Sequence, residues 1–197
     1  MKKSSLVAAI ITLGAIGFFT NTLVHAVAYD TDNSASPTGT APKVIPANHP
    51  SRLIIPTLSI NAAVQDTTIT KRGTMGTPTN FTDVAWYEYG ALPGDPGEAV
   101  IDGHVDNGLG LSGVFKELGN IQKGTDIFIL EHGGTKLHFV VTDVSSYDYK
   151  SVPMEKILYA GRLPRLALIT CEGTWISGEK TYDERVVVTA RLVNTIP

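Results

Sequence analysis

Short runs of β-branched and aromatic residues, separated by glycine and proline, recur along the chain from residue 51 onward. Runs such as "VAWYEYG", "DIFILE", "KLHFVVTDVSSYD", "RLALITC" and "ERVVVTARLV" favour strands, and the glycines and prolines between them favour tight turns. "RLIIPTLSINAAV" predicts two short strands interrupted at Pro56, and "EGTWISGEKTYD" (172–183) predicts a loop. Trp86 is expected to be buried in the core. Helical patterning is limited to "MEKILYAG" and a turn within "GVFKELGNIQKG". About eight strands at short intervals predict a mainly β fold, a closed or nearly closed barrel with one or two short helices.

Length and charge narrow the class of protein. The 197 residues, 43% of them hydrophobic, can build one sizeable core and are too few for two ordinary domains. The net charge is −3 and no cluster of Lys or Arg stands out, so there is no electrostatic reason to expect a nucleic-acid partner.

Residues 1–28 have the pattern of an export signal. Lys2 and Lys3 precede the apolar stretch "LVAAIITLGAIGFF". "AVA", ending at Ala28, offers a cleavage site, and an uncleaved hydrophobic helix is equally compatible with the pattern. In both cases we expect the C-terminal domain outside the cell, at the membrane if the segment is retained and secreted if it is cut after Ala28. Residues 29–50, rich in Ser, Thr, Pro and Asn, predict a flexible extracellular linker, which leaves 51–197 as the globular domain.

The chain contains a single cysteine, Cys171, in the segment "ALITCEG". One cysteine cannot form an internal disulfide, so the thiol of an exported chain is either packed in the core or kept free for a purpose. A cysteine nucleophile requires a base, and acyl transfer also requires a donor for the developing oxyanion.

His104 is the histidine best placed to serve as the base. It follows the apolar run "AVIDG", where a strand ends and a loop begins. His25 and His49 lie outside the predicted domain, His132 falls in a predicted hairpin turn, and His138 alternates within a predicted strand. A purely structural role for His104 remains an alternative at this point.

Arg185 is the candidate oxyanion donor. It opens the predicted strand that follows the one ending in Cys171, and two antiparallel neighbours place the start of one beside the end of the other. A guanidinium offers a fixed fork of donors to an oxyanion. A surface ion pair with Asp183 or Glu184 is the alternative reading.

Taken together, "AVIDGHVD", "LALITCEG" and "YDERVVVTARLV" on a β domain behind an apolar N-terminal segment resemble the sortases, cysteine transpeptidases of the surface of Gram-positive-type bacteria. "AWYEYGALPGDPGEAVIDGHVD" and "GVFKELGNIQKGTDI" extend the resemblance across residues 51–193. It is greatest to class F, with classes D and E next. The family motif around the nucleophile, Thr-Leu-x-Thr-Cys, is kept here except that Ala167 replaces its first threonine.

The resemblance implies an eight-stranded sortase-type barrel. It implies that Cys171 is the nucleophile, His104 the general acid/base and Arg185 the oxyanion or substrate stabiliser. The implied reaction cleaves the Thr-Gly bond of an LPxTG-like sorting signal through a thioacyl enzyme and transfers the protein to an amine of a cell-wall precursor or pilin. No cofactor is implied, and because the acidic pocket of calcium-binding class A members has no counterpart here, we expect no metal.

Residues beside the catalytic candidates are the best predictions for the substrate groove: Thr170 and Ile169 next to the cysteine, and Gly103 and Val105 around the histidine. Two other functions remain open from the sequence. One is another exported cysteine peptidase or transpeptidase, and the other is a secreted, non-catalytic β-barrel binding module whose cysteine packs in the core.

Overall fold

The computed structural model describes residues 44–71, 73–107, 109–158 and 161–197. The predicted signal or anchor segment 1–28 and the first part of the predicted linker lie outside the described residues. Among those that are described, no helix is both long enough and apolar enough to cross a membrane.

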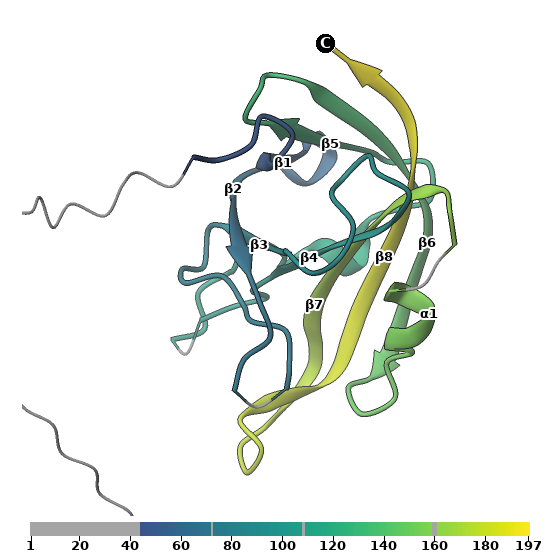
Figure 1. The fold of residues 1–197 in the computed structure, drawn as a ribbon. Coiled ribbons are helices and arrows are strands. Elements are labelled where there is room, and N and C mark those ends of the chain that lie inside the picture. The colour runs from purple at the N-terminus through teal and green to yellow at the C-terminus, as the bar shows by residue number, and fades with distance from the viewer. Residues whose placement is uncertain (1–43, 72, 108, 159–160) are drawn as a thin grey trace, which may run out of the picture. The chain divides into compact units, whose positions relative to one another are not determined.

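Eight strands close into a barrel in the order β1-β2-β3-β4-β7-β8-β6-β5 (Figure 1). The strands are β1 (Pro50–Ile55), β2 (Ile60–Thr67), β3 (Val84–Tyr87), β4 (Gly97–Gly103), β5 (Asp126–Glu131), β6 (Lys136–Asp148), β7 (Pro164–Ile176) and β8 (Thr181–Ile196). Pro56 interrupts the first two, as predicted, and begins the short 3-10 helix η1 (Pro56–Leu58). The predicted mainly β barrel is therefore confirmed.

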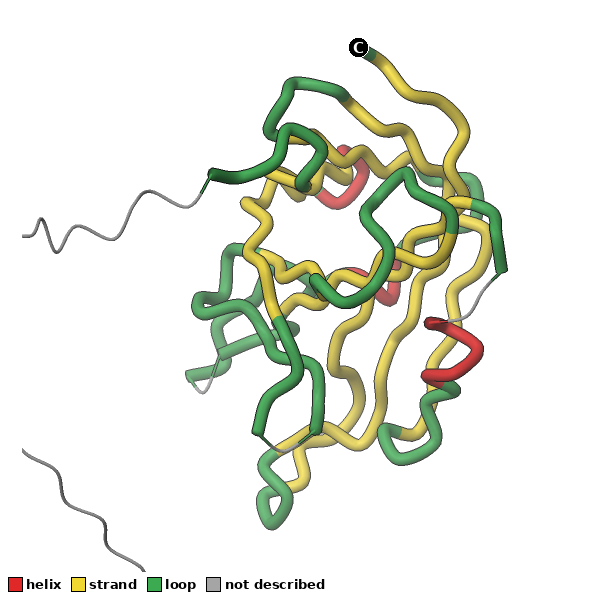
Figure 2. Tube along the Cα trace, viewed as in Figure 1, coloured by secondary structure: helices red, strands yellow, loops and turns green. Residues whose placement is uncertain are grey.

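The helical elements are few and short (Figure 2). Besides η1, the described residues form η2 (Leu118–Asn120), within the connection from β4 to β5, and α1 (Met154–Leu158), between β6 and β7. Both occur where the sequence predicted helical turns.

Alternation along the strands separates an inner from an outer apolar cluster. Ala99 and Ile101 of β4 point into the main core, together with Leu166 and Leu168 of β7. The intervening side chains point to the outside, since side chains of a strand alternate between its two faces. The outer cluster joins β4, β7 and β8 to α1 and consists of Val100, Ile157, Ala167, Ile169 and Val187.

The hairpin of β7 and β8 is longer than predicted. Residues 172–183 were expected to form a loop, but Trp175 pairs with Tyr182 and Ile176 with Thr181. A register shift between Glu172 and Trp175 lets the strands continue past Cys171. The expectation that Arg185 opens its strand is therefore wrong, because β8 already begins at Thr181.

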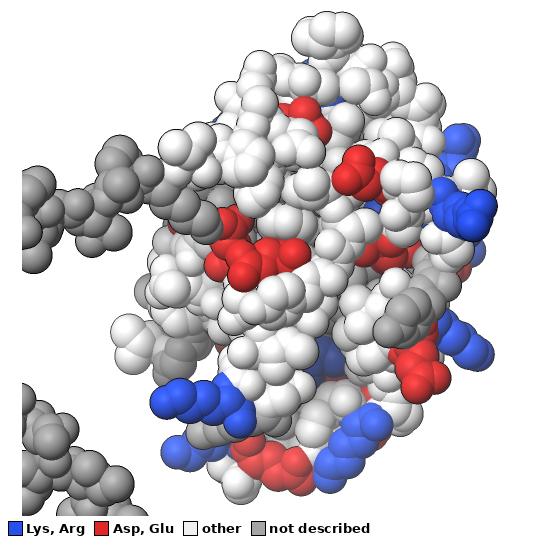
Figure 3. All heavy atoms as spheres, in the orientation of Figure 1, with Lys and Arg blue, Asp and Glu red and all other residues white. Residues whose placement is uncertain are grey.

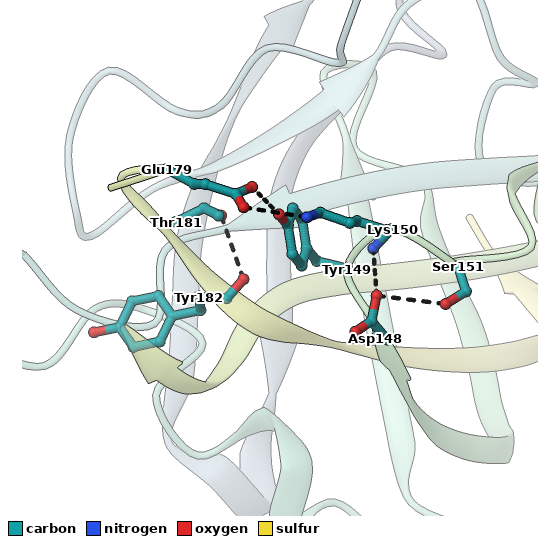
Figure 4. A network of polar contacts seen from close by, with 7 residues as sticks. All are labelled: Asp148, Tyr149, Lys150, Ser151, Glu179, Thr181 and Tyr182. Carbon is teal, nitrogen blue, oxygen red and sulfur yellow. Dashed lines mark hydrogen bonds and ion pairs between the residues drawn. The ribbon is translucent and has the colours of Figure 1, made fainter. Parts of the chain in front are cut away.

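Polar contacts hold the tip of this hairpin against the segment after β6 (Figure 4). Glu179 accepts hydrogen bonds from the Tyr149 hydroxyl and, at 3.1 Å, from the Lys150 ammonium. Asp148 in turn accepts from the Lys150 amide at 2.8 Å. These contacts fix the end of the hairpin that lies beyond Cys171.

The end of the predicted linker contacts the barrel. The His132 amide donates to the His49 carbonyl at 2.9 Å, and the Gly133 amide to the Ala47 carbonyl at 2.7 Å. The His49 ring meets the edge of Trp86, which is buried in the core as predicted.

On the face drawn in Figure 3, basic side chains lie scattered among acidic ones.

Candidate active site

Cys171 lies on the outer face of β7, directly beyond the outer cluster. It is two residues after Ile169, so both side chains point to the same face. The thiol is partly buried. In the antiparallel ladder, Cys171 pairs with Arg185 of β8, which sets the thiol and the guanidinium side by side on neighbouring strands.

His104 comes next to Cys171 through the parallel pairing of β4 with β7. Asp102 pairs with Ile169 in that ladder, so the residue that follows β4 falls beside the position of the cysteine. The buried hydroxyl of Thr170 donates to the Gly103 carbonyl at 2.8 Å and ties the two segments together. The topology thus brings all three predicted catalytic residues to one region of the outer surface.

The imidazole of His104 is held from the side opposite β7. Its Nε2 lies 3.0 Å from the Pro78 carbonyl, and its ring contacts Phe81 with centroids 4.8 Å apart. A carbonyl oxygen can only accept, so Nε2 carries a proton and Nδ1 is the nitrogen that can take one up.

The backbone of His104 is fixed by the following loop. Its carbonyl accepts from the Phe115 amide at 2.9 Å, and the Val105 carbonyl accepts from the Gly113 amide at 2.9 Å. A Cβ at Gly113 would lie only 2.3 Å from the His104 carbonyl oxygen, so the loop packs this closely only because that residue is glycine.

Arg185 is oriented by its own hairpin. One terminal nitrogen donates to the carbonyls of Tyr182 and Glu184, at 3.0 and 2.8 Å. The other donates to the Thr181 hydroxyl at 2.7 Å, and the guanidinium lies 5.6 Å from the centre of the Tyr149 ring. These partners fix the position of a positive charge beside the thiol.

The resting thiol is not activated. Burial raises the pKa of Cys171 above its ordinary value, Arg185 opposes that rise, and the carboxylates of Asp102 and Asp106 add to it. The reactive form of a cysteine is the thiolate, so the site requires a base to remove the proton, and His104 is the base at hand.

A pocket of about 110 Å³ opens beside the thiol. Its lining includes Cys171, Thr170, Val105, Tyr182 and Glu172. A pocket of this size can accept a small part of a peptide or an incoming amine next to the nucleophile.

The four predicted groove residues have different surroundings. Val105 and Thr170 line the pocket, although the Thr170 hydroxyl already donates its hydrogen bond to the Gly103 carbonyl. Gly103 is buried, and a Cβ there would lie 2.5 Å from the Phe115 ring. Ile169 packs in the outer cluster. Their contacts with substrate remain predictions.

Three residues near the thiol were missed from the sequence: Asp102, Asp106 and Tyr182. The Tyr182 hydroxyl donates to the Asp106 carboxylate, and this bond raises the pKa of Tyr182 to about 12. The spacing Asp-x-His-x-Asp in "DGHVD" already placed both carboxylates on the histidine's side of an extended segment. The partnership with Tyr182, 76 residues away in sequence, had no local signal.

Within the described part of the chain, no group of three or more His, Cys, Asp or Glu residues is arranged to hold a metal ion.

The family model described as the sortase domain matches residues 53–193, which include all three candidate catalytic residues. The chain belongs to the sortase family. Sortases are cysteine transpeptidases, and a catalytic cysteine in this sortase agrees with the placement of Cys171 beside Arg185.

Solved structures of sortases share the fold. Sortase C-1 from Actinomyces oris is 19% identical, with 73% of each chain covered and a TM-score of 0.57. Sortase A from Listeria monocytogenes is 18% identical over 74% of this chain and 87% of that one, with a TM-score of 0.55. Sortase A from Corynebacterium diphtheriae is 18% identical over 74% and 61%, with a TM-score of 0.58. No curated protein matched this sortase.

Proposed function

We propose that this sortase cleaves the Thr-Gly bond of an LPxTG-like sorting signal and joins the released protein to an amine. The observation that carries the proposal is the cross-strand pairing of Cys171 with Arg185, next to the end of the strand that delivers His104. A nucleophile, a base and a fixed cation on one surface are the parts that acyl transfer through a thioester requires.

In the proposed first half-reaction, the imidazole of His104 takes the proton of Cys171, and the thiolate attacks the carbonyl carbon of the substrate threonine. The negative charge that forms on the carbonyl oxygen is stabilised by Arg185. The intermediate then collapses, the bond to the glycine nitrogen breaks, and His104 returns its proton to the leaving amine. The threonine acyl group remains on the sulfur as a thioester.

In the second half-reaction, an incoming amine attacks the thioester carbonyl and His104 takes the amine's proton. Collapse of this intermediate breaks the carbon–sulfur bond, forms the new amide and releases Cys171. Water in place of the amine gives hydrolysis. The proposed acceptor is a cell-wall precursor or a pilin amine, and the class F assignment, with D and E as alternatives, is part of the same proposal.

The proposed location is the outer side of the cell membrane, with residues 1–28 as anchor. The support is the sequence alone: two lysines before an apolar stretch and a polar, proline-containing segment before the barrel. Protease treatment of intact cells should remove the catalytic domain if it is exported, and protection from the protease would contradict the location.

The test of the reaction uses the full chain in mild detergent with a library of LPxTG-like peptides and triglycine, followed by mass spectrometry. The expected product is the peptide ending in threonine joined to triglycine. Cys171→Ala should give none. Release of the free acid alone, at a rate unaffected by triglycine, would identify a peptidase and overturn the transpeptidase proposal.

A further inference from the structure

Asp102 lies on the outer face of β4, between the outer cluster and the predicted catalytic residues. Val100, two residues before it, packs in that cluster, and His104 follows two residues after it. Side chains two apart on a strand share a face. Asp102 pairs with Ile169 of β7, and Ile169 is itself two residues before Cys171.

The charged and titratable groups around this carboxyl come from several elements. β8 contributes Arg185, and β7 contributes Cys171. The connection after β4 carries His104 and Asp106, whereas β3 presents only Ala85 opposite Asp102. In the strand order β4-β7-β8, Cys171 lies between the strand of Asp102 and the strand of Arg185. The carboxylate and the guanidinium therefore act on the thiol from its two sides, with opposite sign.

We propose that Asp102 is a positioning residue of the active site, whose charge determines how strongly Arg185 favours the thiolate of Cys171. With Asp102 ionised, its negative charge offsets part of the effect of the guanidinium on the sulfur, and the thiol holds its proton more strongly. With Asp102 neutral, the same guanidinium acts on the sulfur, and on an oxyanion, without that opposing charge. The catalytic consequence rests on the proposed function, but the effect on the thiol does not.

The ionisation of Asp102 is poised to make this difference at physiological pH. Burial raises the pKa of its carboxyl to about 7, against the opposing effects of Arg185 and of a hydrogen bond from the Gly103 amide. The neutral form is present below that pH and the charged form above it. The same carboxylate is among the groups that raise the pKa of Cys171.

Asp106 also raises the pKa of Cys171, but its surroundings differ. Its carboxylate accepts the Tyr182 hydroxyl, so removing its charge would also change a bond between the loop and the hairpin. A substitution at Asp102 removes the charge with less change of structure, because asparagine reproduces the shape of the neutral acid that burial favours.

The experiment measures the rate of Cys171 alkylation by iodoacetamide against pH in the full chain, with Asp102→Asn compared to the unaltered protein. We expect the inflection of the thiol to move down by about one pH unit, the effect of one nearby charge. Between pH 7 and the inflection the rate should rise about threefold, because the tenfold gain in thiolate is partly offset by its lower nucleophilicity. Below pH 7 the two rates should converge, since Asp102 is then neutral in the unaltered protein as well. Asp95→Asn is the matched control, since that exposed carboxylate acts on Glu131 and is absent from the groups acting on Cys171.

An unchanged inflection in Asp102→Asn, or an equal shift in Asp95→Asn, overturns the proposal. Circular dichroism checks the fold, and Asp102→Ala, which should shift the inflection in the same direction, replaces the asparagine variant if that one does not fold. The alkylation needs no substrate, so failure of the proposed transpeptidation is recognised separately, as a chain with the predicted thiol behaviour that forms no amide.

Discussion

The buried carboxyl of Glu98 should make the free energy of unfolding depend on pH. The Glu98 side chain is 2% exposed at the start of β4, and neither carboxylate oxygen has a hydrogen-bond partner among the residues that the structure describes. Burial raises its pKa from 4.5 to about 7, although Arg165 opposes the rise. The folded state therefore favours the protonated acid, and the stabilisation is fully present below pH 4.5 and is lost as the pH rises through 7. Each pKa unit corresponds to about 1.4 kcal/mol, so the loss amounts to about 3 kcal/mol.

Glu98→Gln removes this pH dependence, since glutamine has no proton to lose. Urea unfolding of both chains at pH 4.5 and pH 8.5, followed by tryptophan fluorescence, gives the two free energies of unfolding. The variant should gain about 3 kcal/mol relative to the unaltered chain between these two pH values. Asp102 is present in both chains, so its own titration cancels in the difference. Glu155→Gln, at an exposed position in α1, is the control. A difference between the chains that stays constant with pH would refute the account of a buried, unpaired carboxyl.

Three further substitutions test how the active site is held. Gly113→Ala should lower kcat/KM about 100-fold, because a Cβ 2.3 Å from the His104 carbonyl displaces that backbone; an unchanged rate would show that the loop does not position the histidine. Thr170→Val should lower the free energy of unfolding by about 1–3 kcal/mol, since the Gly103 carbonyl loses its buried donor, and urea titrations showing no loss would contradict this. Arg185→Lys should cost about 100-fold in kcat with the circular dichroism spectrum unchanged, because lysine cannot reproduce the guanidinium's fork of donors; full turnover would remove the residue from the mechanism.

Local sequence patterns were sufficient to predict most strands of the barrel. The strands at 126–131 and 136–148 have the predicted bounds, because alternation and a glycine turn specify a hairpin over a few residues. The continuation of β7 and β8 past Cys171 was missed, since "EGTWISGEKTYD" is rich in polar residues and glycine. Cross-strand pairing, such as Trp175 with Tyr182, extends these strands where their own composition does not predict it.

The sequence proposed three catalytic residues, which strand pairing places in one region, but it did not predict the charges that act on them. Cys171, His104 and Arg185 were recognised by their order along the chain and by family resemblance. That Asp102 acts on Arg185, and that Tyr182 bonds to Asp106, depends on strands brought together by barrel closure. Local sequence carries no record of such distant partners.

The central claim is that Cys171 forms a thioester with the substrate. Its most direct test is the intact mass of the full chain after incubation with an LPxTG-like peptide in the absence of any amine, quenched in acid and mapped by digestion. The account predicts an added mass equal to the peptide acyl group through its threonine, located on Cys171 and released as an amide when triglycine is supplied. Peptide cleavage that proceeds without an adduct, and at an equal rate in Cys171→Ala, would contradict it.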